Sequence, residues 1–521
     1  MRMVAAVVTI LLAGAVTPAF AGEPHGLDAL LHQKITWAAC AEADLAEAGV
    51  ECSSVQVPMD YRAPEGKLIT VAISRRQARD RAQRRGVLMT NPGGPGGEGL
   101  GLATILAEQP AGAVYDVIGM DPRGVGASTR LLCGRTGFPD VTSRPTEAEL
   151  PLWGQYAKEV EANCARVGGE LRQHVTTMNT ARDMDLIRSV LGERKISYLG
   201  YSYGTFLGAM YGQLFPEHLD RSVLDSALDP GKTWHEQDYD TVATLKDNLA
   251  AWEQWVAQRD KSLHLGSSSQ AVQQVLDRFA AVLAKRGLGA LSDVTTFDAK
   301  VGDRTRYRAM WAPFARNLAK LLPALDGGAV DTAAAQEIVG KESAQRGERN
   351  VDGVYPAVTC DWHWPSDVDS YYADMRRIAR DFPYGLTANF MAPKNCAFTK
   401  GRDPMVAIGA RQYPAGLVVQ GEGDTQTAYP NGVAMAAHLR EPLISVLDDG
   451  THGHFASTGN ACVDQAVNAY LVAGTLPARR TACAATDKAE DIPVDGSTAP
   501  MPSVQRSLSE VTAEINARPI R

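Results

Sequence analysis

A serine in a tight turn is the feature of this chain best suited to chemistry. The residues Gly200-Tyr201-Ser202-Tyr203-Gly204 follow an apolar strand candidate, Lys195–Leu199, and lead into a helix-like run, Thr205–Tyr211. A Gly-x-Ser-x-Gly at a strand-to-helix junction is typical of a nucleophile elbow, in which the serine takes a strained backbone conformation and its hydroxyl points away from the sheet. Ser202 is therefore the candidate nucleophile.

A nucleophilic serine needs a histidine as its base and a carboxylate that orients the histidine. In hydrolases whose serine lies in such a nucleophile elbow, the three residues follow the chain order serine, acid, histidine. The strand candidate Leu417–Gln420 runs into Gly421-Glu422-Gly423-Asp424, so an acid lies just past the end of a late strand. We expect Asp424 to be the orienting acid, and Glu422 and Asp448 are its rivals.

The base is expected on the loop that follows the last strand candidate, Leu443–Leu447. This loop contains His452 and His454, and a histidine at this place can reach back across the strand ends to the serine. His452 is favoured because Gly453 follows it in a tight loop, and His454 is the alternative. Any one of these residue types is usually a surface residue, but the order of all three favours catalysis.

A glycine-rich loop supplies the remaining part of a hydrolytic site. The apolar run Gly86–Thr90 leads into Asn91-Pro92-Gly93-Gly94-Pro95-Gly96-Gly97-Glu98-Gly99. Such a loop lets backbone N–H groups approach an anion closely. Phosphate binding is disfavoured because no Gly-Lys-Ser/Thr follows. We expect the N–H groups of Gly94 and Tyr203 to form an oxyanion hole.

These groups need a sheet that brings strand ends together. The segments 52–58 and 68–73 alternate like antiparallel edge strands, whereas 86–90 and 115–120 are apolar on both faces, as buried parallel strands are. A helix candidate, Thr180–Leu191, and a further strand candidate, Ser222–Asp225, continue the alternation. We therefore predict an α/β-hydrolase fold, with a mostly parallel, doubly wound sheet and a helical cap insertion.

The order of the segments suggests where this core is interrupted. We expect a core at 22–231 with an excursion at 129–178, a helical cap at 232–400, the rest of the core at 401–490 and a polar tail at 491–521. Six of the eight tryptophans lie in the cap: Trp234, Trp252, Trp255, Trp311, Trp362 and Trp364. They either build a small helical core or line a substrate cleft beneath the cap.

Composition and the N-terminus indicate the compartment and partners. The net charge is −8, which gives no reason to expect nucleic acid or an anionic membrane as a partner. Arg2 precedes the apolar run Val4–Val16, and Ala19-Phe20-Ala21 resembles a cleavage site. We therefore predict a signal peptide at 1–21, export of the chain and no membrane attachment after cleavage.

The cysteines agree with an exported protein. None of the eight forms a Cys-x-x-Cys pair, which disfavours zinc or redox chemistry, and the expected site needs no metal or cofactor. Many connectivities are possible, and the simplest joins neighbours in the sequence. These pairs are Cys40 with Cys52, Cys133 with Cys164, Cys360 with Cys396, and Cys462 with Cys483.

Taken together, the motifs make the chain similar to the secreted tripeptidyl aminopeptidases of actinobacteria, which belong to the prolyl-aminopeptidase-like α/β-hydrolases. The resemblance covers nearly the whole mature chain. It rests on segments 91–99, 121–128, 200–205, 215–217, 223–225, 421–424, 452–453 and 462–483. It implies Ser202, Asp424 and His452 as the triad, a helical cap, and removal of short peptides from a free N-terminus.

Two departures from the family pattern bear on the substrate. Glu98 replaces a usual serine in the glycine-rich loop, and the segment after the acid is Asp424-Thr425-Gln426-Thr427-Ala428 rather than Asp-Pro-Val-Thr-Pro. An exopeptidase must bind a protonated α-amine, which calls for a carboxylate in the cleft. The candidates are Glu98 and four acids of the cap: Glu236, Asp238, Asp240 and Asp361.

The sequence thus predicts a secreted serine exopeptidase that releases di- or tripeptides from peptides with a free N-terminus. The first alternative is an esterase or amidase that acts on small non-peptide substrates, because the same triad serves any acyl group. The second is an exported binding protein without catalysis, which the intact triad disfavours. The oligomeric state stays open.

Overall fold

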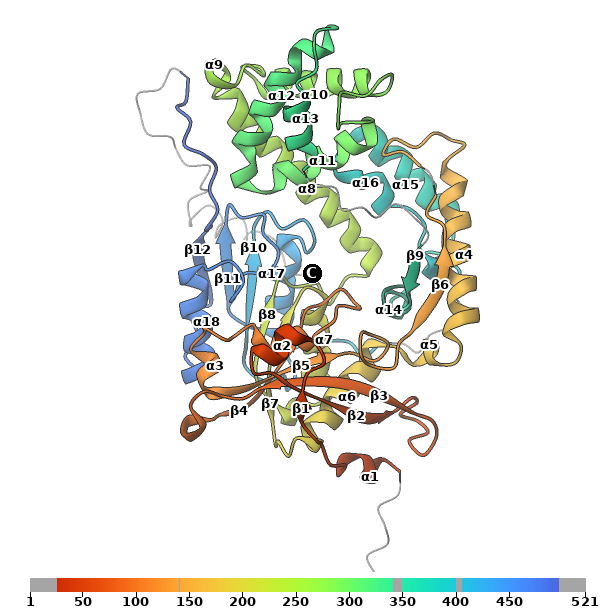
Figure 1. The fold of residues 1–521 in the computed structure, drawn as a ribbon, viewed down its shortest axis with the longest axis vertical. Coiled ribbons are helices and arrows are strands. Elements are labelled where there is room, and N and C mark those ends of the chain that lie inside the picture. The colour runs from red at the N-terminus through yellow and green to blue at the C-terminus, as the bar shows by residue number, and fades with distance from the viewer. Residues whose placement is uncertain (1–25, 140, 341–348, 400–404, 496–521) are drawn as a thin grey trace, which may run out of the picture.

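Strands from both ends of the chain meet in one sheet of ten strands (Figure 1). The computed structural model describes residues 26–139, 141–340, 349–399 and 405–495. In spatial order the strands are β1 (Ala38–Ala39), β2 (Glu51–Pro58), β3 (Leu68–Arg76), β5 (Tyr115–Asp121), β4 (Gly86–Asn91), β7 (Ile196–Tyr201), β8 (Leu219–Asp225), β10 (Gly416–Gly421), β11 (Leu443–Leu447) and β12 (Arg480–Ala484).

The strand directions agree with the sequence pattern. β1, β2 and β3 pair antiparallel and β3 pairs antiparallel with β5, whereas every pair from β5 to β12 is parallel. All residues of β4 and β5 are buried, as their uninterrupted apolar runs predict. The α/β-hydrolase fold is therefore confirmed. β12 was not expected, because its residues are largely polar or exposed at the sheet edge.

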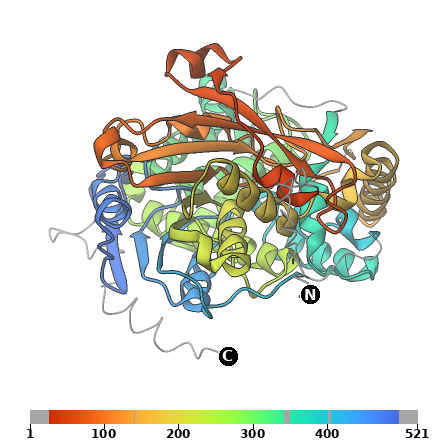
Figure 2. The same cartoon turned by 90° about the horizontal axis from the view of Figure 1, so that it is seen from below.

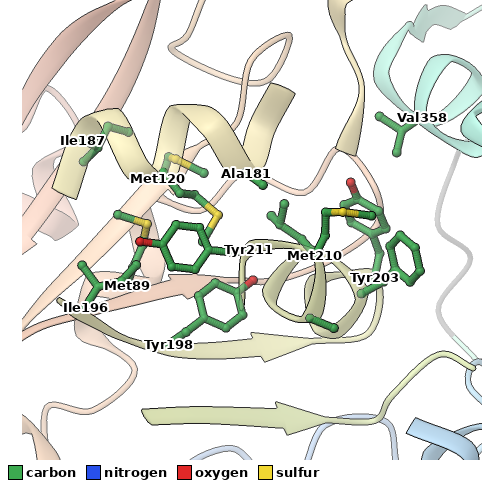
Figure 3. Close-up of a cluster of buried hydrophobic side chains, with 14 of the residues drawn as sticks. Met89, Met120, Ala181, Ile187, Ile196, Tyr198, Tyr203, Met210, Tyr211 and Val358 are labelled. Atoms are coloured by element: carbon green, nitrogen blue, oxygen red, sulfur yellow. The ribbon is translucent and has the colours of Figure 1, made fainter. Parts of the chain in front are cut away.

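Helices cover both faces of this sheet. The core helices are α1 (Leu27–Leu31), α2 (Ala43–Glu47), α3 (Ala111–Val114), α6 (Thr177–Val190), α7 (Tyr203–Leu214), α17 (Tyr429–Leu439) and α18 (Ala461–Ala473). Side chains of α6, α7 and α17 share one apolar cluster with the sheet, and those of α3 and α18 share another. Figure 3 shows Tyr211 of α7 beside Met89 of β4 in the first cluster.

Most of the insertion between β8 and β10 is helical and lies beyond the carboxyl ends of β10 and β11 (Figure 1). Its helices are α8 (Trp234–Ala257), α9 (Asp260–Leu263), α10 (Ser269–Leu283), α11 (Val294–Arg306), α12 (Trp311–Leu325), α13 (Thr332–Val339), α14 (Val354–Val358), α15 (Val368–Asp381) and α16 (Thr387–Phe390). Side-chain caps define where several begin. Thr233 and Glu236 form a capping box at the start of α8, for example.

The excursion after β5 joins this insertion rather than standing apart. It contains β6 (Leu132–Thr136), α4 (Leu150–Gly168) and α5 (Leu171–His174). β6 pairs antiparallel with β9 (Arg349–Asp352) of the insertion, and α4 packs on α15. Leu150 and Trp153 belong to the same buried cluster as the cap helices. Two segments distant in sequence therefore build one cap.

The tryptophans of the cap lie in different packing environments. Trp252, Trp255 and Trp311 are buried in the helical core of the cap. Trp234 and Trp362 instead pack against the core of the sheet domain, close to the helix that follows Ser202. The helical core of the cap is thus confirmed for three of the tryptophans, and a substrate cleft lined by others stays a prediction.

All eight cysteines are paired as the sequence order favours: Cys40–Cys52, Cys133–Cys164, Cys360–Cys396 and Cys462–Cys483. In the described part of the chain, no helix combines the length and apolar character needed to cross a membrane. The predicted signal peptide at 1–21 lies outside the described residues, as does the tail beyond residue 495.

Candidate active site

Ser202 lies at the junction of β7 and α7 in the geometry of a nucleophile elbow. Its φ of 57° and ψ of −128° are unfavourable for a residue with a side chain and cost about 1–3 kcal/mol. A Cβ at Gly200 would lie 2.4 Å from the carbonyl oxygen of Gly204, so the turn requires glycine there. The Ser202 N–H donates to the carbonyl of Asp225, which fixes the turn on β8.

The glycine-rich loop lies directly against this turn. A Cβ at Gly93 would be 2.5 Å from the carbonyl oxygen of Tyr201 and 2.8 Å from the Cβ of Ser202, so only glycine allows this approach. The Gly93 N–H donates to Asn91 Oδ1, which shapes the loop at the end of β4. The next residue, Gly94, is exposed beside the elbow. Tyr203 opens α7, where N–H groups have no acceptor within the helix.

The acid and the histidine meet as the strand order predicts. His452 Nδ1 lies 2.7 Å from Asp424 Oδ2, and the Asp424 side chain is fully buried. This contact leaves His452 Nε2 available to a serine hydroxyl. The rivals lie elsewhere: Glu422 accepts the backbone N–H of Asp448, and Asp448 pairs with Arg308.

The alternative base, His454, is enclosed in the protein interior. Its side chain is fully buried and both ring nitrogens lack a hydrogen-bond partner, so it does not open towards substrate. Its backbone N–H and that of Phe455 donate to the Asp225 carboxylate, and the N–H of Gly453 donates to Ser226 Oγ. These bonds tie the histidine loop to the end of β8.

Two residues outside the sequence-predicted triad, Thr427 and Arg306, complete the surroundings of Asp424. Thr427 Oγ1 donates to Asp424 Oδ2 at 2.8 Å, and Arg306 Nη2 of α11 lies 3.5 Å from Asp424 Oδ1. Burial by itself raises the pKa of Asp424, but the bond from His452 and the Arg306 charge together bring that pKa below its usual value. Asp424 is therefore held ionised.

The cap is bonded directly to the acid and histidine loops. Asn248 of α8 donates to the carbonyl of Gly423, and Arg306 Nε donates to the carbonyl of Gly450. Arg308 Nε pairs with Asp448 Oδ1 at 2.5 Å. The sequence gives no sign of these three contacts, because they depend on how the cap docks on the core. Of the residues around Asp424, only Thr427 could be suspected from the sequence, since it follows the acid by three positions.

Two of the five acids considered for amine binding, Glu98 and Asp361, lie in different surroundings. Glu98 is exposed at the end of the glycine-rich loop. Asp361 Oδ2 accepts the backbone N–H of Thr177 at 2.8 Å, and the Thr177 hydroxyl is 2.9 Å from the Tyr203 hydroxyl. Both assignments stay predictions. No group of acidic, histidine or cysteine side chains within the described ranges is arranged to hold a metal ion.

A strained serine between strand and helix, followed in the sheet by an acid–histidine pair at strand ends, defines an α/β-hydrolase. Two family models match the chain: "alpha/beta hydrolase fold" over residues 86–329 and "TAP-like protein" over residues 386–483. The tripeptidyl aminopeptidase of Streptomyces lividans is 35% identical over 86% of this chain and 86% of its own length. The chain therefore belongs to the tripeptidyl aminopeptidase family of serine hydrolases.

Two other relatives bear different activity names. The serine protease Hip1 of Mycobacterium tuberculosis is 28% identical over 92% of this chain and 96% of its own length. A protein named carboxylesterase B, from the same organism, is 32% identical over 91% of this chain and 94% of its own length. Peptidase and esterase names thus both occur among relatives that cover nearly the whole chain.

Proposed function

We propose that this protein is a secreted serine exopeptidase that removes di- or tripeptides from the free N-terminus of peptides. The observation that carries the proposal is the Asp424–His452 hydrogen bond beside the strained elbow of Ser202. The tripeptidyl aminopeptidase relative supports a peptide substrate. Four disulfides support the exported location.

In the acylation step, Ser202 Oγ attacks the scissile carbonyl carbon while His452 Nε2 takes the hydroxyl proton. Asp424 holds His452 in the required tautomer and stabilises the imidazolium. The N–H groups of Gly94 and Tyr203 bind the tetrahedral oxyanion, and removal of one such donor typically costs about 10²–10³ in rate. The carbon–nitrogen bond then breaks, and His452 gives its proton to the leaving amine.

The acyl-enzyme carries the released di- or tripeptide as an ester of Ser202. A water molecule gives a proton to His452 and attacks the ester carbonyl, and the oxyanion occupies the same N–H groups. Collapse of the second tetrahedral intermediate breaks the ester bond and returns the proton to Ser202 Oγ. All these steps use side chains and backbone groups of the chain itself.

A direct test is mass spectrometry of the products from a free peptide ladder and an N-acetylated ladder, with the wild type and Ser202→Ala. We expect short N-terminal fragments from the free ladder only and none from the variant. Equal cleavage of both ladders contradicts an exopeptidase. The fragment masses count the residues that are released per cut.

The second candidate is an esterase or amidase that acts on small acyl substrates, and the carboxylesterase relative favours it. This function predicts turnover of p-nitrophenyl esters without cleavage of either peptide ladder. The same set of assays therefore separates the two functions.

A further inference from the structure

Buried polar atoms without partners gather at the first turns of α8, outside the acid–histidine pair. Trp234 Nε1, His235 Nδ1 and Asp238 Oδ2 are all inaccessible to solvent and have no hydrogen-bond partner among the described residues. An unsatisfied buried polar group is destabilising, so three on adjacent turns of one helix call for an explanation. A polar ligand that enters between cap and core would satisfy them.

Aromatic contacts join this cluster to the residue that follows the candidate nucleophile and to the glycine-rich loop. The ring of Trp234 stacks on that of Tyr203, which follows Ser202, with ring centroids 6.5 Å apart. Trp234 also meets Tyr355 edge-on at 6.1 Å. The neighbour of Tyr355, Val354, lies against Gly96 of the glycine-rich loop, because a Cβ at Gly96 would be 3.3 Å from the Val354 Cβ.

Asp238 lies one helical turn beyond Trp234 on the same face of α8, about 6 Å further along the axis. Burial raises the pKa of Asp238 to about 7, against the opposing charge of Lys394. Burial is the main cause of the raised pKa values of Tyr355 and Tyr371, and the charge of Asp238 adds to both.

The other acids considered for amine binding already have partners or face solvent. Glu236 is exposed and closes the capping box of α8, and Asp240 pairs with Lys232 at 2.6 Å. Asp361 accepts the N–H of Thr177, and Glu98 is exposed. Of these five acids, Asp238 is the one with a buried oxygen that lacks a partner.

Lys394 is the cation whose charge lowers the pKa of Asp238. The two side chains do not form a direct ion pair. The ammonium group of Lys394 donates to the carbonyl of Asn389 at 3.4 Å, and no contact with Asp238 within salt-bridge distance occurs in the described structure. Burial lowers the pKa of Lys394. Asp238 can therefore still accept a cationic group.

We propose that Asp238 is the anchor for the α-ammonium group of the substrate and that Trp234 Nε1 donates to a peptide carbonyl oxygen between Asp238 and Ser202. This inference rests on the proposed exopeptidase function. Two or three extended residues span roughly 7–11 Å. Asp238 lies about 6 Å along α8 from Trp234, whose ring stacks on that of Tyr203. An anchor at this place would set the length of the released peptide.

The test compares Asp238→Asn with the wild type on three substrates. They are a tripeptide p-nitroanilide with a free N-terminal amine, its N-acetyl form and p-nitrophenyl acetate. Asparagine keeps the shape and removes the charge. We expect kcat/KM for the free tripeptide to fall about 10- to 100-fold, as the loss of a charge-assisted bond requires. Turnover of p-nitrophenyl acetate is expected to stay within twofold, which shows that the fold and the triad are intact.

A binding measurement separates the anchor from catalysis. In the Ser202→Ala background, calorimetry compares the Kd of a free tripeptide with that of its N-acetyl form, with and without Asp238→Asn. We expect the preference for the free amine to disappear with the carboxylate. Asp326→Asn is the control, because Asp326 is an exposed cap residue paired with Arg278 and should leave the preference unchanged.

The outcomes distinguish the two proposals. If Asp238→Asn keeps the wild-type preference for free amines in binding and turnover, Asp238 is not the anchor, and the exopeptidase proposal stands. If the wild type cleaves neither peptide but hydrolyses the acetate ester, the exopeptidase proposal fails. The binding preference in Ser202→Ala then decides whether Asp238 recognises an amine.

Discussion

The guanidinium group of Arg306 lies 3.5 Å from Asp424 Oδ1, so a cap residue is in contact with the acid of the proposed triad. Arg306 also donates to the carbonyl of Gly450 in the histidine loop. One side chain of the cap therefore bonds to both loops that carry the proposed acid and base. The cap is thus part of the proposed catalytic geometry.

Replacing Arg306 with alanine should lower kcat about 10- to 100-fold for peptide and ester substrates alike, with little change in KM. The physical reason is that Asp424 loses a charge that lowers its pKa, and the Gly450 carbonyl loses its donor. Steady-state kinetics on both substrates measure this effect. Arg278→Ala is the control, because Arg278 forms a surface pair. A kcat within twofold of the wild type contradicts this role.

Thr427→Val should reduce kcat about 5- to 30-fold, because Asp424 Oδ2 loses a hydroxyl donor at 2.8 Å while the shape of the side chain is kept. Thr427→Ser keeps the hydroxyl and should retain most of the activity. The comparison of the two variants in the same ester assay isolates the hydrogen bond. Equal losses in both would show that packing, not the bond, matters at this position.

Gly93→Ala should decrease kcat at least about 100-fold, because the added Cβ would lie 2.5 Å from the Tyr201 carbonyl oxygen and would push the glycine-rich loop off the elbow. The rate of Ser202 labelling by a fluorophosphonate should fall as well. Gly101→Ala is the matched control, since a Cβ there meets no atom within 4 Å. Unchanged labelling of Gly93→Ala would argue against the oxyanion role of this loop.

Glu253→Gln should stabilise the protein in a pH-dependent manner. Burial, with a contribution from Asp277, raises the pKa of Glu253 to about 7 from an ordinary value of 4.5, and Oε1 has no partner. The folded state therefore holds a proton that the unfolded state releases between these pH values, and the carboxylate lowers stability increasingly as pH rises through this window.

The prediction is that the Tm of Glu253→Gln exceeds that of the wild type at pH 8 and approaches it near pH 4.5. Thermal unfolding followed by circular dichroism across this range measures the difference. Glu337→Gln is the control, because Glu337 is exposed on α13 and its replacement should give no such trend. A Tm difference that is constant with pH would contradict the assigned burial effect.

The sequence predicts those strands and turns whose burial or backbone geometry determines their own residue types. β4 and β5 are buried on both faces, so their apolar runs identify them, and the elbow requires glycines at fixed spacing around Ser202. β12 escaped detection because an edge strand can carry exposed polar residues such as Arg480. β12 is a strand because it pairs with β11, and its own residue pattern does not indicate one.

The candidate site likewise contains residues that the sequence predicts and residues that depend on tertiary packing. Ser202, Asp424 and His452 could be proposed from their order and strand ends, but Arg306 could not, because its contact depends on how α11 docks on the acid loop. Asp238 stands between Glu236 and Asp240 in the sequence, and the three look alike there. Only the packing of α8 shows that one of them is buried without a partner.

The pairing of β6 with β9 has a consequence for the order of events during synthesis. Leu132 pairs with Asp352, which emerges from the ribosome about 220 residues later, or roughly 10–45 s at ordinary rates of translation. Until then, the excursion at 129–178 has no partner strand and exposes the side chains that α15 will cover. The nascent chain therefore passes through a long interval in which a half-built cap must be kept from aggregation.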